Sequence, residues 1–165
     1  MPRPARGVVA SVVLTTLLAV LLSGCGSDEV PIDSPDVPAA DREACAALVE
    51  ALPDRLFGEL RRPVDPDDAL GAAWGDPAVE LRCGVGVPTG YDEFSPCIEV
   101  RRVGWFVPQA QLEDLGGEAV ATVLTHAPRV ELTVPADYRT IGVDQALADL
   151  APVVRNHLEP GKPCH

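Results

Sequence analysis

Hydrophobic side chains recur from residue 45 onward at the spacing of an amphipathic helix. The run follows Asp41, a residue type that caps helix N-termini well. Its apolar positions fall at i, i+3, i+4, i+7 and i+11, and they are Cys45, Leu48, Val49, Leu52 and Leu56. Positions with this spacing share one face, so the pattern predicts a helix with Cys45 on its buried stripe.

A second stripe of the same kind predicts a helix from about Val143 to Leu158. Its apolar positions are Leu147, Leu150, Val154 and Leu158. Pro152 lies inside this run, and a proline in a helix interior removes a hydrogen bond and clashes with the preceding turn. We therefore expect Pro152 to kink this helix or to end its first half.

Between these helices the pattern changes to the alternation of β-strands. From Val79 to Val87, apolar residues and Cys83 stand at every second position, with polar residues or glycine between them. Successive side chains of a strand point to opposite faces, so Cys83 should lie on the buried face. Cys97 to Val107 is a second extended stretch, and its alternation changes phase at Arg101-Arg102, which indicates a bulge or a tight turn.

Ala119 to Thr125 and Arg129 to Val134 predict a hairpin hinged near Ala127-Pro128. Gly58 to Trp74 is rich in proline and aspartate and is predicted as a loop. The links between the predicted strands are short, so a sheet of about four strands should be mostly antiparallel. The predicted fold class is α+β, with an N-terminal and a C-terminal helix packed on this sheet and disulfide bonds stapling the domain.

The first 25 residues have the pattern of an export signal that ends in a lipidated cysteine. Two arginines come first, Val8 to Leu22 is almost wholly apolar, and the small pair Ser23-Gly24 precedes Cys25. As a helix, the apolar stretch reaches only ~22 Å, which is short for a hydrocarbon core of ~30 Å. Leu22-Ser23-Gly24-Cys25 resembles the bacterial lipobox, whose cysteine is lipidated before the signal peptide is removed. The alternatives are an uncleaved spanning helix and an ordinary secretory signal.

Residues 26–40 hold three prolines and four acidic residues and lack apolar periodicity. Such a composition predicts a stiff, extended spacer that reaches up to ~45 Å. The expected organisation is a signal peptide over 1–24, a lipidated cysteine with a disordered acidic tether over 25–40, and one globular domain over 41–165. The expected location is the extracytoplasmic face of a cell membrane, with the lipid on Cys25 as the anchor.

The charge of the chain restricts its partners. The full sequence carries a net charge of −12. Cleavage before Cys25 would remove Arg3 and Arg6 and no acidic residue, which leaves 25 acidic against 11 basic residues, or −14. A chain of this charge is repelled by nucleic acid, so we expect no nucleic-acid partner.

With Cys25 lipidated, four cysteines remain in an oxidising compartment, and they are Cys45, Cys83, Cys97 and Cys164. Three pairings are possible. A helix packed on the buried face of the sheet would bring Cys45 and Cys83 together, so we predict this disulfide and, by elimination, Cys97–Cys164. The rival interpretation is a metal site, but no C-x-x-C motif occurs and Cys164-His165 is a weak ligand signal.

The sequence offers little for catalysis. Ser95 is the only serine beyond residue 40, and no G-x-S-x-G surrounds it. Lys162 is the only lysine, so no S-x-x-K motif exists. His126 and His157 fit surface or satisfied positions, and chemistry by a pair of carboxylates stays open as an alternative. We therefore expect no catalytic residue, no cofactor and no metal.

Four patches of this sequence resemble an actinobacterial family of small secreted or lipidated proteins, domain-of-unknown-function family 3515. They are Cys45-x-x-Leu48-x-x-x-Leu52-Pro53-x-x-Leu56-x-Gly58, Trp74-Gly75-x-Pro77-x-Val79-x-Leu81-Arg82-Cys83-Gly84-Val85, Val100-x-x-Val103-x-Trp105 and Val130-x-Leu132-Thr133-Val134-Pro135-x-x-Tyr138. The resemblance implies a Cys45–Cys83 pair, and Cys97 and Cys164 look like additions to the family's pattern. It implies no activity, because the family has none assigned.

Two functions fit these features. The first is a non-enzymatic interaction module that presents a surface to an envelope protein, with an exposed apolar patch expected around Trp74 or Trp105. The alternative is a carrier of a small ligand or lipid, with a closed cavity expected between the sheet and the helices.

Overall fold

Twelve strands and three helices form the part of the chain that the structure, a computed structural model, describes, residues 28–164. The signal peptide expected over 1–24, Cys25 and residues 26–27 lie outside these residues, as does His165. The helices are α2 (Ala39–Glu50), α3 (Gln109–Glu113) and α4 (Val143–His157), with a 3₁₀ turn at Ala136–Tyr138. The strands are β1 (Val30–Pro31), β2 (Arg55–Leu56), β3 (Glu59–Arg62), β4 (Val64–Asp65), β5 (Gly71–Trp74), β6 (Val79–Val85), β7 (Ile98–Val100), β8 (Val103–Phe106), β9 (Ala119–Val123), β10 (His126–Ala127), β11 (Arg129–Val134) and β12 (Glu159–Pro160).

Eight of these strands form one antiparallel sheet in the order β2-β3-β5-β6-β11-β9-β8-β7. The α+β class and the antiparallel sheet are therefore confirmed, but the prediction of about four strands is wrong. Residues 59–74 were predicted as a loop and instead supply β3, β4 and β5. All four residues of β5 are buried and none is polar, so this strand has no alternation of apolar and polar residues for a sequence pattern to detect.

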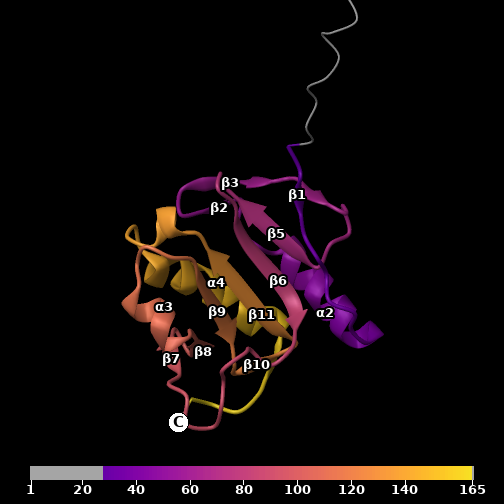
Figure 1. The fold of residues 1–165 in the computed structure, drawn as a ribbon. Helices are drawn as coiled ribbons and strands as arrows, with labels where there is room; N and C mark the ends of the chain where they lie inside the picture. Colours follow the sequence, from indigo (N-terminus) through magenta and orange to yellow (C-terminus); the bar gives the residue numbers. More distant parts are fainter. Residues whose placement is uncertain (1–27, 165) are drawn as a thin grey trace, which may run out of the picture.

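Helices α2 and α4 pack against each other and against the same face of the sheet (Figure 1). Helix α2 begins at Ala39 rather than after Asp41, and no side chain caps its N-terminus. Helix α4 runs to His157 without ending at Pro152. Leu150, before this proline, and Val154, after it, are both buried in the core. Packing against the sheet therefore holds both halves of α4 in one helix.

The N-terminal segment covers part of the opposite face of the sheet. β1 pairs in parallel with β4, and Val30 and Ile32 (3% exposed) pack with Ala73 in a separate apolar cluster. A Cβ atom on Gly71 would lie 2.8 Å from Ile32 Cγ2, so glycine is what lets the segment approach β5. The Leu70 amide donates a hydrogen bond to Ser34 Oγ at 2.7 Å. This corrects the tether expected over residues 25–40, because the chain belongs to the fold from Asp28.

Two disulfides staple this architecture, and they join the pairs expected from the sequence. Cys45–Cys83 connects α2 to β6 with the Cα atoms 5.5 Å apart. Cys97–Cys164 connects the start of β7 to the C-terminal segment, with the Cα atoms 5.6 Å apart. The phase change at Arg101-Arg102 is a tight turn between β7 and β8, in which φ is positive at both residues (47° and 67°).

Candidate functional site

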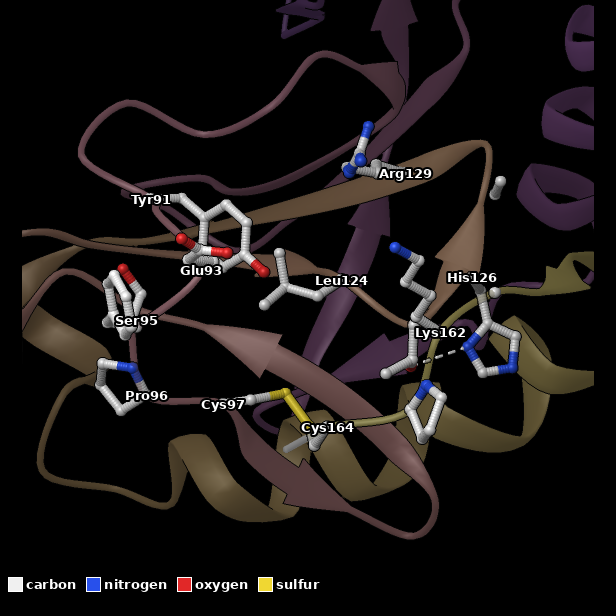
Figure 2. Close-up of a pocket in the computed structure, with 15 residues that line it drawn as sticks. Tyr91, Glu93, Ser95, Pro96, Cys97, Leu124, His126, Arg129, Lys162 and Cys164 are labelled. Atoms are coloured by element: carbon white, nitrogen blue, oxygen red, sulfur yellow. Dashed lines mark hydrogen bonds between the residues drawn. A yellow bond between two sulfur atoms is a disulfide. The ribbon is translucent and has the colours of Figure 1, made fainter.

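The candidate site is a hollow of about 530 Å³ at one end of the molecule (Figure 2). Two segments far apart in sequence enclose it, the 88–97 loop and the C-terminal strap (residues 159–164), and the Cys97–Cys164 disulfide ties them together. The residues around it are Tyr91, Glu93, Phe94, Ser95, Pro96, Cys97, Leu124, Thr125, His126, Ala127, Arg129, Gly161, Lys162, Pro163 and Cys164.

Hydrogen bonds within the 88–97 loop shape one wall of the hollow. The Asp92 amide donates to Ser95 Oγ and the Phe94 amide donates to Asp92 Oδ1, both at 2.9 Å. These bonds form a turn built on an aspartate side chain. The turn leaves the Phe94 ring 87% exposed at the rim, while the Tyr91 ring packs edge-on against Phe106 at 5.4 Å.

The C-terminal strap forms the facing wall. β12 pairs with β10, and the Gly161 amide donates a hydrogen bond to the Thr125 carbonyl at 2.7 Å. Beneath the disulfide, a Cβ atom on Gly104 would lie 2.6 Å from Cys97 Sγ and 2.6 Å from Thr125 Cγ2. Only glycine leaves room there, so Gly104 of β8 sets how closely the disulfide sits on the sheet.

His126 is buried beside the hollow and is held by a short polar chain. The Gly104 amide donates to Thr125 Oγ1 at 2.8 Å, and this oxygen lies 3.0 Å from His126 Nδ1. Burial lowers the pKa of the His126 imidazole below its ordinary value, and the positive charge of Arg155 lowers that pKa further. The imidazole is therefore neutral at neutral pH and adds no charge to the site.

The charges at the hollow are separated. Figure 2 places Arg129 and Lys162 on one side, with the Lys162 ammonium group pointing toward Arg129, and Glu93 on the other side. Within residues 28–164 the structure has a single ion pair, Arg82–Glu131, so neither Arg129 nor Lys162 is paired there. Arg129 Nε is buried and meets no hydrogen-bond acceptor among the same residues.

Among residues 28–164, the geometry brings no serine or cysteine nucleophile together with a histidine base in the hollow. Ser95 Oγ bonds to Asp92 within its own loop, and Figure 2 shows Ser95 and His126 on opposite sides. Cys97 and Cys164 are joined in a disulfide. Over the described part of the chain, His, Cys, Asp and Glu side chains nowhere gather in threes that could hold a metal ion.

The two tryptophans expected at an interaction surface are interior residues. Trp74 and Trp105 are both 0% exposed and lie in the main core, and Trp74 Nε1 donates to the Pro53 carbonyl at 3.0 Å. The prediction of an exposed apolar patch around Trp74 or Trp105 is therefore wrong. Exposed leucines lie elsewhere, beside an apolar groove of about 190 Å³ next to α3, where Leu112 and Leu115 stand at the surface.

Sequence reasoning noted Ser95, His126 and Lys162 singly and did not bring them to one site. It gave Arg129 no role. The signal that could have joined them was the Cys97–Cys164 pairing, because this bond places the 88–97 loop beside the C-terminus. A lysine two residues before one cysteine and an acidic loop before the other then become neighbours.

Fold and site together define a small α+β domain, stapled by two disulfides, with an open hollow of mixed polarity. The chain belongs to the family described as Protein of unknown function (DUF3515), whose sequence profile matches residues 6–163. The membership in domain-of-unknown-function family 3515 that the four patches indicated is thus confirmed. No curated protein and no solved structure matches the chain. Between residues 28 and 164, no helix is long and apolar enough to cross a bilayer.

Proposed function

We propose that this protein is a lipoprotein, held by a lipid on Cys25 at the extracytoplasmic face of a cell membrane, whose domain binds an envelope protein without catalysis. The lipobox-like Leu22-Ser23-Gly24-Cys25 and the apolar stretch before it support the anchor. Both lie within the residues that the family profile matches. The two disulfides suit an oxidising compartment outside the cytoplasm.

The position of the hollow is the observation that carries the binding role. The described chain begins at one end of the molecule, and the hollow lies with the C-terminal strap at the other end (Figure 1). Five residues lead from Cys25 to the buried Val30, and a chain of this length spans at most about 16–18 Å. An anchored domain would therefore hold its β1 end near the membrane and turn the hollow toward other envelope components.

The anchor is tested by replacing its cysteine. Cys25→Ser should leave the protein unprocessed at residue 25 and without a lipid, because the hydroxyl cannot form the thioether. The wild type should stay in the membrane fraction through a high-salt wash and shift in mass by its acyl groups. A wild type whose mass shows no acyl groups would refute the anchor.

The binding role is tested by site-directed photocrosslinking in intact cells. A photoreactive residue replaces Phe94 at the rim of the hollow or, as the matched control, Leu60 at the β1 end. Both side chains are large, apolar and exposed, at 87% and 58%. The same protein should crosslink reproducibly at position 94 and not at position 60. Equal labelling at both positions, or none at 94, would contradict the proposal.

A second candidate is a carrier of a small ligand, and the size of the hollow favours it. Its volume of about 530 Å³ falls within the range of about 300–1,000 Å³ typical of small-molecule sites. The space expected for such a ligand, between the sheet and the helices, is occupied by core side chains and the Cys45–Cys83 disulfide. A small molecule that co-purifies in place of a crosslinked protein would favour the carrier.

A further inference from the structure

We infer that the hollow binds a carboxylate joined to an apolar group, with Arg129 and Lys162 as the cations that hold it. This inference rests on the proposed function, because it takes the hollow as the surface that binds. It names the chemistry that a partner or a ligand must present there.

Arg129 has hydrogen-bonding groups that no ion pair within residues 28–164 uses. Its Nε is buried and, among residues 28–164, meets no acceptor. A buried donor without a partner destabilises a protein relative to one that is hydrogen-bonded. Arginine presents its N–H groups as a planar fork that matches a carboxylate in two parallel hydrogen bonds. A carboxylate in the hollow would bind the terminal N–H groups of Arg129, because the buried Nε is closed to a ligand.

Two cations, Arg129 and Lys162, lie together at the hollow of an acidic chain. Lys162 is the only lysine of the sequence, and the chain carries a net charge of −12. Lys162 lies on the C-terminal strap, which the disulfide and the Gly161–Thr125 hydrogen bond fix beside Arg129. Two cations that form no ion pair within residues 28–164, on one side of a concave site, attract an anion.

Apolar and aromatic side chains form part of the remaining lining, beside its polar groups. Tyr91, Phe94 and Leu124 line the hollow with Pro96 and Pro163, and Figure 2 shows Leu124 near its centre and Tyr91 beside Glu93. A ligand with its carboxylate at Arg129 and Lys162 would place its adjoining group against these side chains. Burial of apolar surface there would favour an apolar adjoining group over a polar one.

The remaining charged group limits the charge of the ligand. Glu93 lies across the hollow from the two cations, and His126 is neutral at neutral pH. A second negative charge on the ligand would therefore approach Glu93 and be repelled. The hollow should take a monocarboxylate in preference to a dicarboxylate. The carboxylate can belong to a free small acid or to the C-terminus of a peptide.

The test titrates the full-length protein, extracted from membranes in a non-ionic detergent, with 3-phenylpropionate and with its neutral amide. The two probes have nearly the same shape and differ in charge. Calorimetry or NMR should detect the acid and show the amide to bind at least about tenfold more weakly. A peptide ending in phenylalanine, with a free or an amidated C-terminus, distinguishes the peptide source from the small-acid source.

Variants assign the binding to the named residues. Arg129→Gln and Lys162→Gln should each weaken acid binding by about tenfold, whereas Arg42→Gln, at an exposed position of α2, should leave it unchanged. Glu93→Gln should strengthen binding of a dicarboxylate. Lys162 is exposed, so its replacement tests the inference even if Arg129→Gln does not fold.

Equal binding of acid and amide, or binding that survives Lys162→Gln unchanged, would overturn the inference. These results would leave the proposed function intact if position 94 still crosslinks to one protein in cells. Loss of that crosslink alone would contradict the proposed function and leave the carboxylate site supported. The two failures are therefore distinguishable.

Discussion

Arg139 is a buried charge that orders a segment with little core of its own. Its guanidinium donates to the carbonyl of Gly117 at 3.1 Å, to that of Asp114 at 3.4 Å, and to that of Gln111. The Gln111 carbonyl belongs to α3, and those of Asp114 and Gly117 belong to the segment between α3 and β9, which also borders the apolar groove. Hydrogen bonds from this one side chain thus hold the segment in place, whereas core packing holds other parts of the chain.

Arg139→Lys should loosen this segment. Lysine keeps the charge but cannot present N–H groups to three carbonyls in the fixed geometry of a guanidinium. We expect the free energy of unfolding to fall by about 1–3 kcal/mol, with faster amide hydrogen exchange around Gly116 and Gly117. Arg42→Lys, at an exposed position, is the matched control for urea unfolding. Equal unfolding curves for the two variants would contradict this role of Arg139.

His126 should make the domain less stable in acid. Unfolding returns its imidazole to water, where the pKa is near the ordinary value of 6.5. Between the lowered folded pKa and 6.5, the unfolded state binds more protons, so the free energy of unfolding falls as the pH is lowered through this range. His126→Gln should therefore reduce the loss of melting temperature between about pH 7.5 and pH 5. An equal loss in variant and wild type would show that His126 does not contribute.

At the residue scale, the sequence predicted which face of its own helix or strand a residue occupies. Cys45 and Cys83 each stand on the buried face of a regular pattern, so their pairing followed from periodicity. Glu93, Arg129 and Lys162 lie around one hollow only because two loops and a strand meet there in the folded chain. No local spacing encodes such a meeting, and so the hollow was not predicted.

At the scale of elements, the sequence predicted the regular ones and missed those buried on both sides or very short. The hairpin of β9 and β11 and the helices α2 and α4 have clear periods, and all were predicted. β1 and β4 have two residues each, too few to show alternation. Proline and aspartate around β1 gave the composition of a spacer, but Val30 and Ile32 find a buried place because Gly71 leaves room for them.

Ile32→Ala tests whether this N-terminal segment is part of the folded unit. Truncation of a side chain that is 3% exposed should lower the free energy of unfolding by about 2–3 kcal/mol. Val87→Ala truncates a side chain that is 62% exposed and should change it by no more than about 0.5 kcal/mol. Urea denaturation of both variants gives the comparison. A spacer outside the fold would make the two substitutions equally neutral.

At the scale of the whole molecule, the proposed lipid on Cys25, only five residues before Val30 in the sequence, predicts an orientation on the membrane. Leu60 of β3 lies at the β1 end, where Arg62 donates a hydrogen bond to the Asp28 carbonyl at 2.9 Å, and Phe94 lies at the far end. In vesicles containing a gadolinium-chelating lipid, NMR signals near Leu60 should therefore broaden more than those near Phe94. Without the anchor, in Cys25→Ser, the difference should vanish. Equal broadening in the anchored protein would argue for free tumbling on a long tether.

The two disulfides also decide how the domain would carry a mechanical load between the membrane and a bound partner. A pull on the N-terminus can extend the residues ahead of Cys45 but not the ring from Cys45 to Cys83, because the disulfide passes the force into β6. A pull applied at the hollow meets a second closed ring, from Cys97 to Cys164. The two disulfides would thus limit the length of chain that tension can pull out. The Cys97–Cys164 bond would also keep the two walls of the hollow joined under that tension.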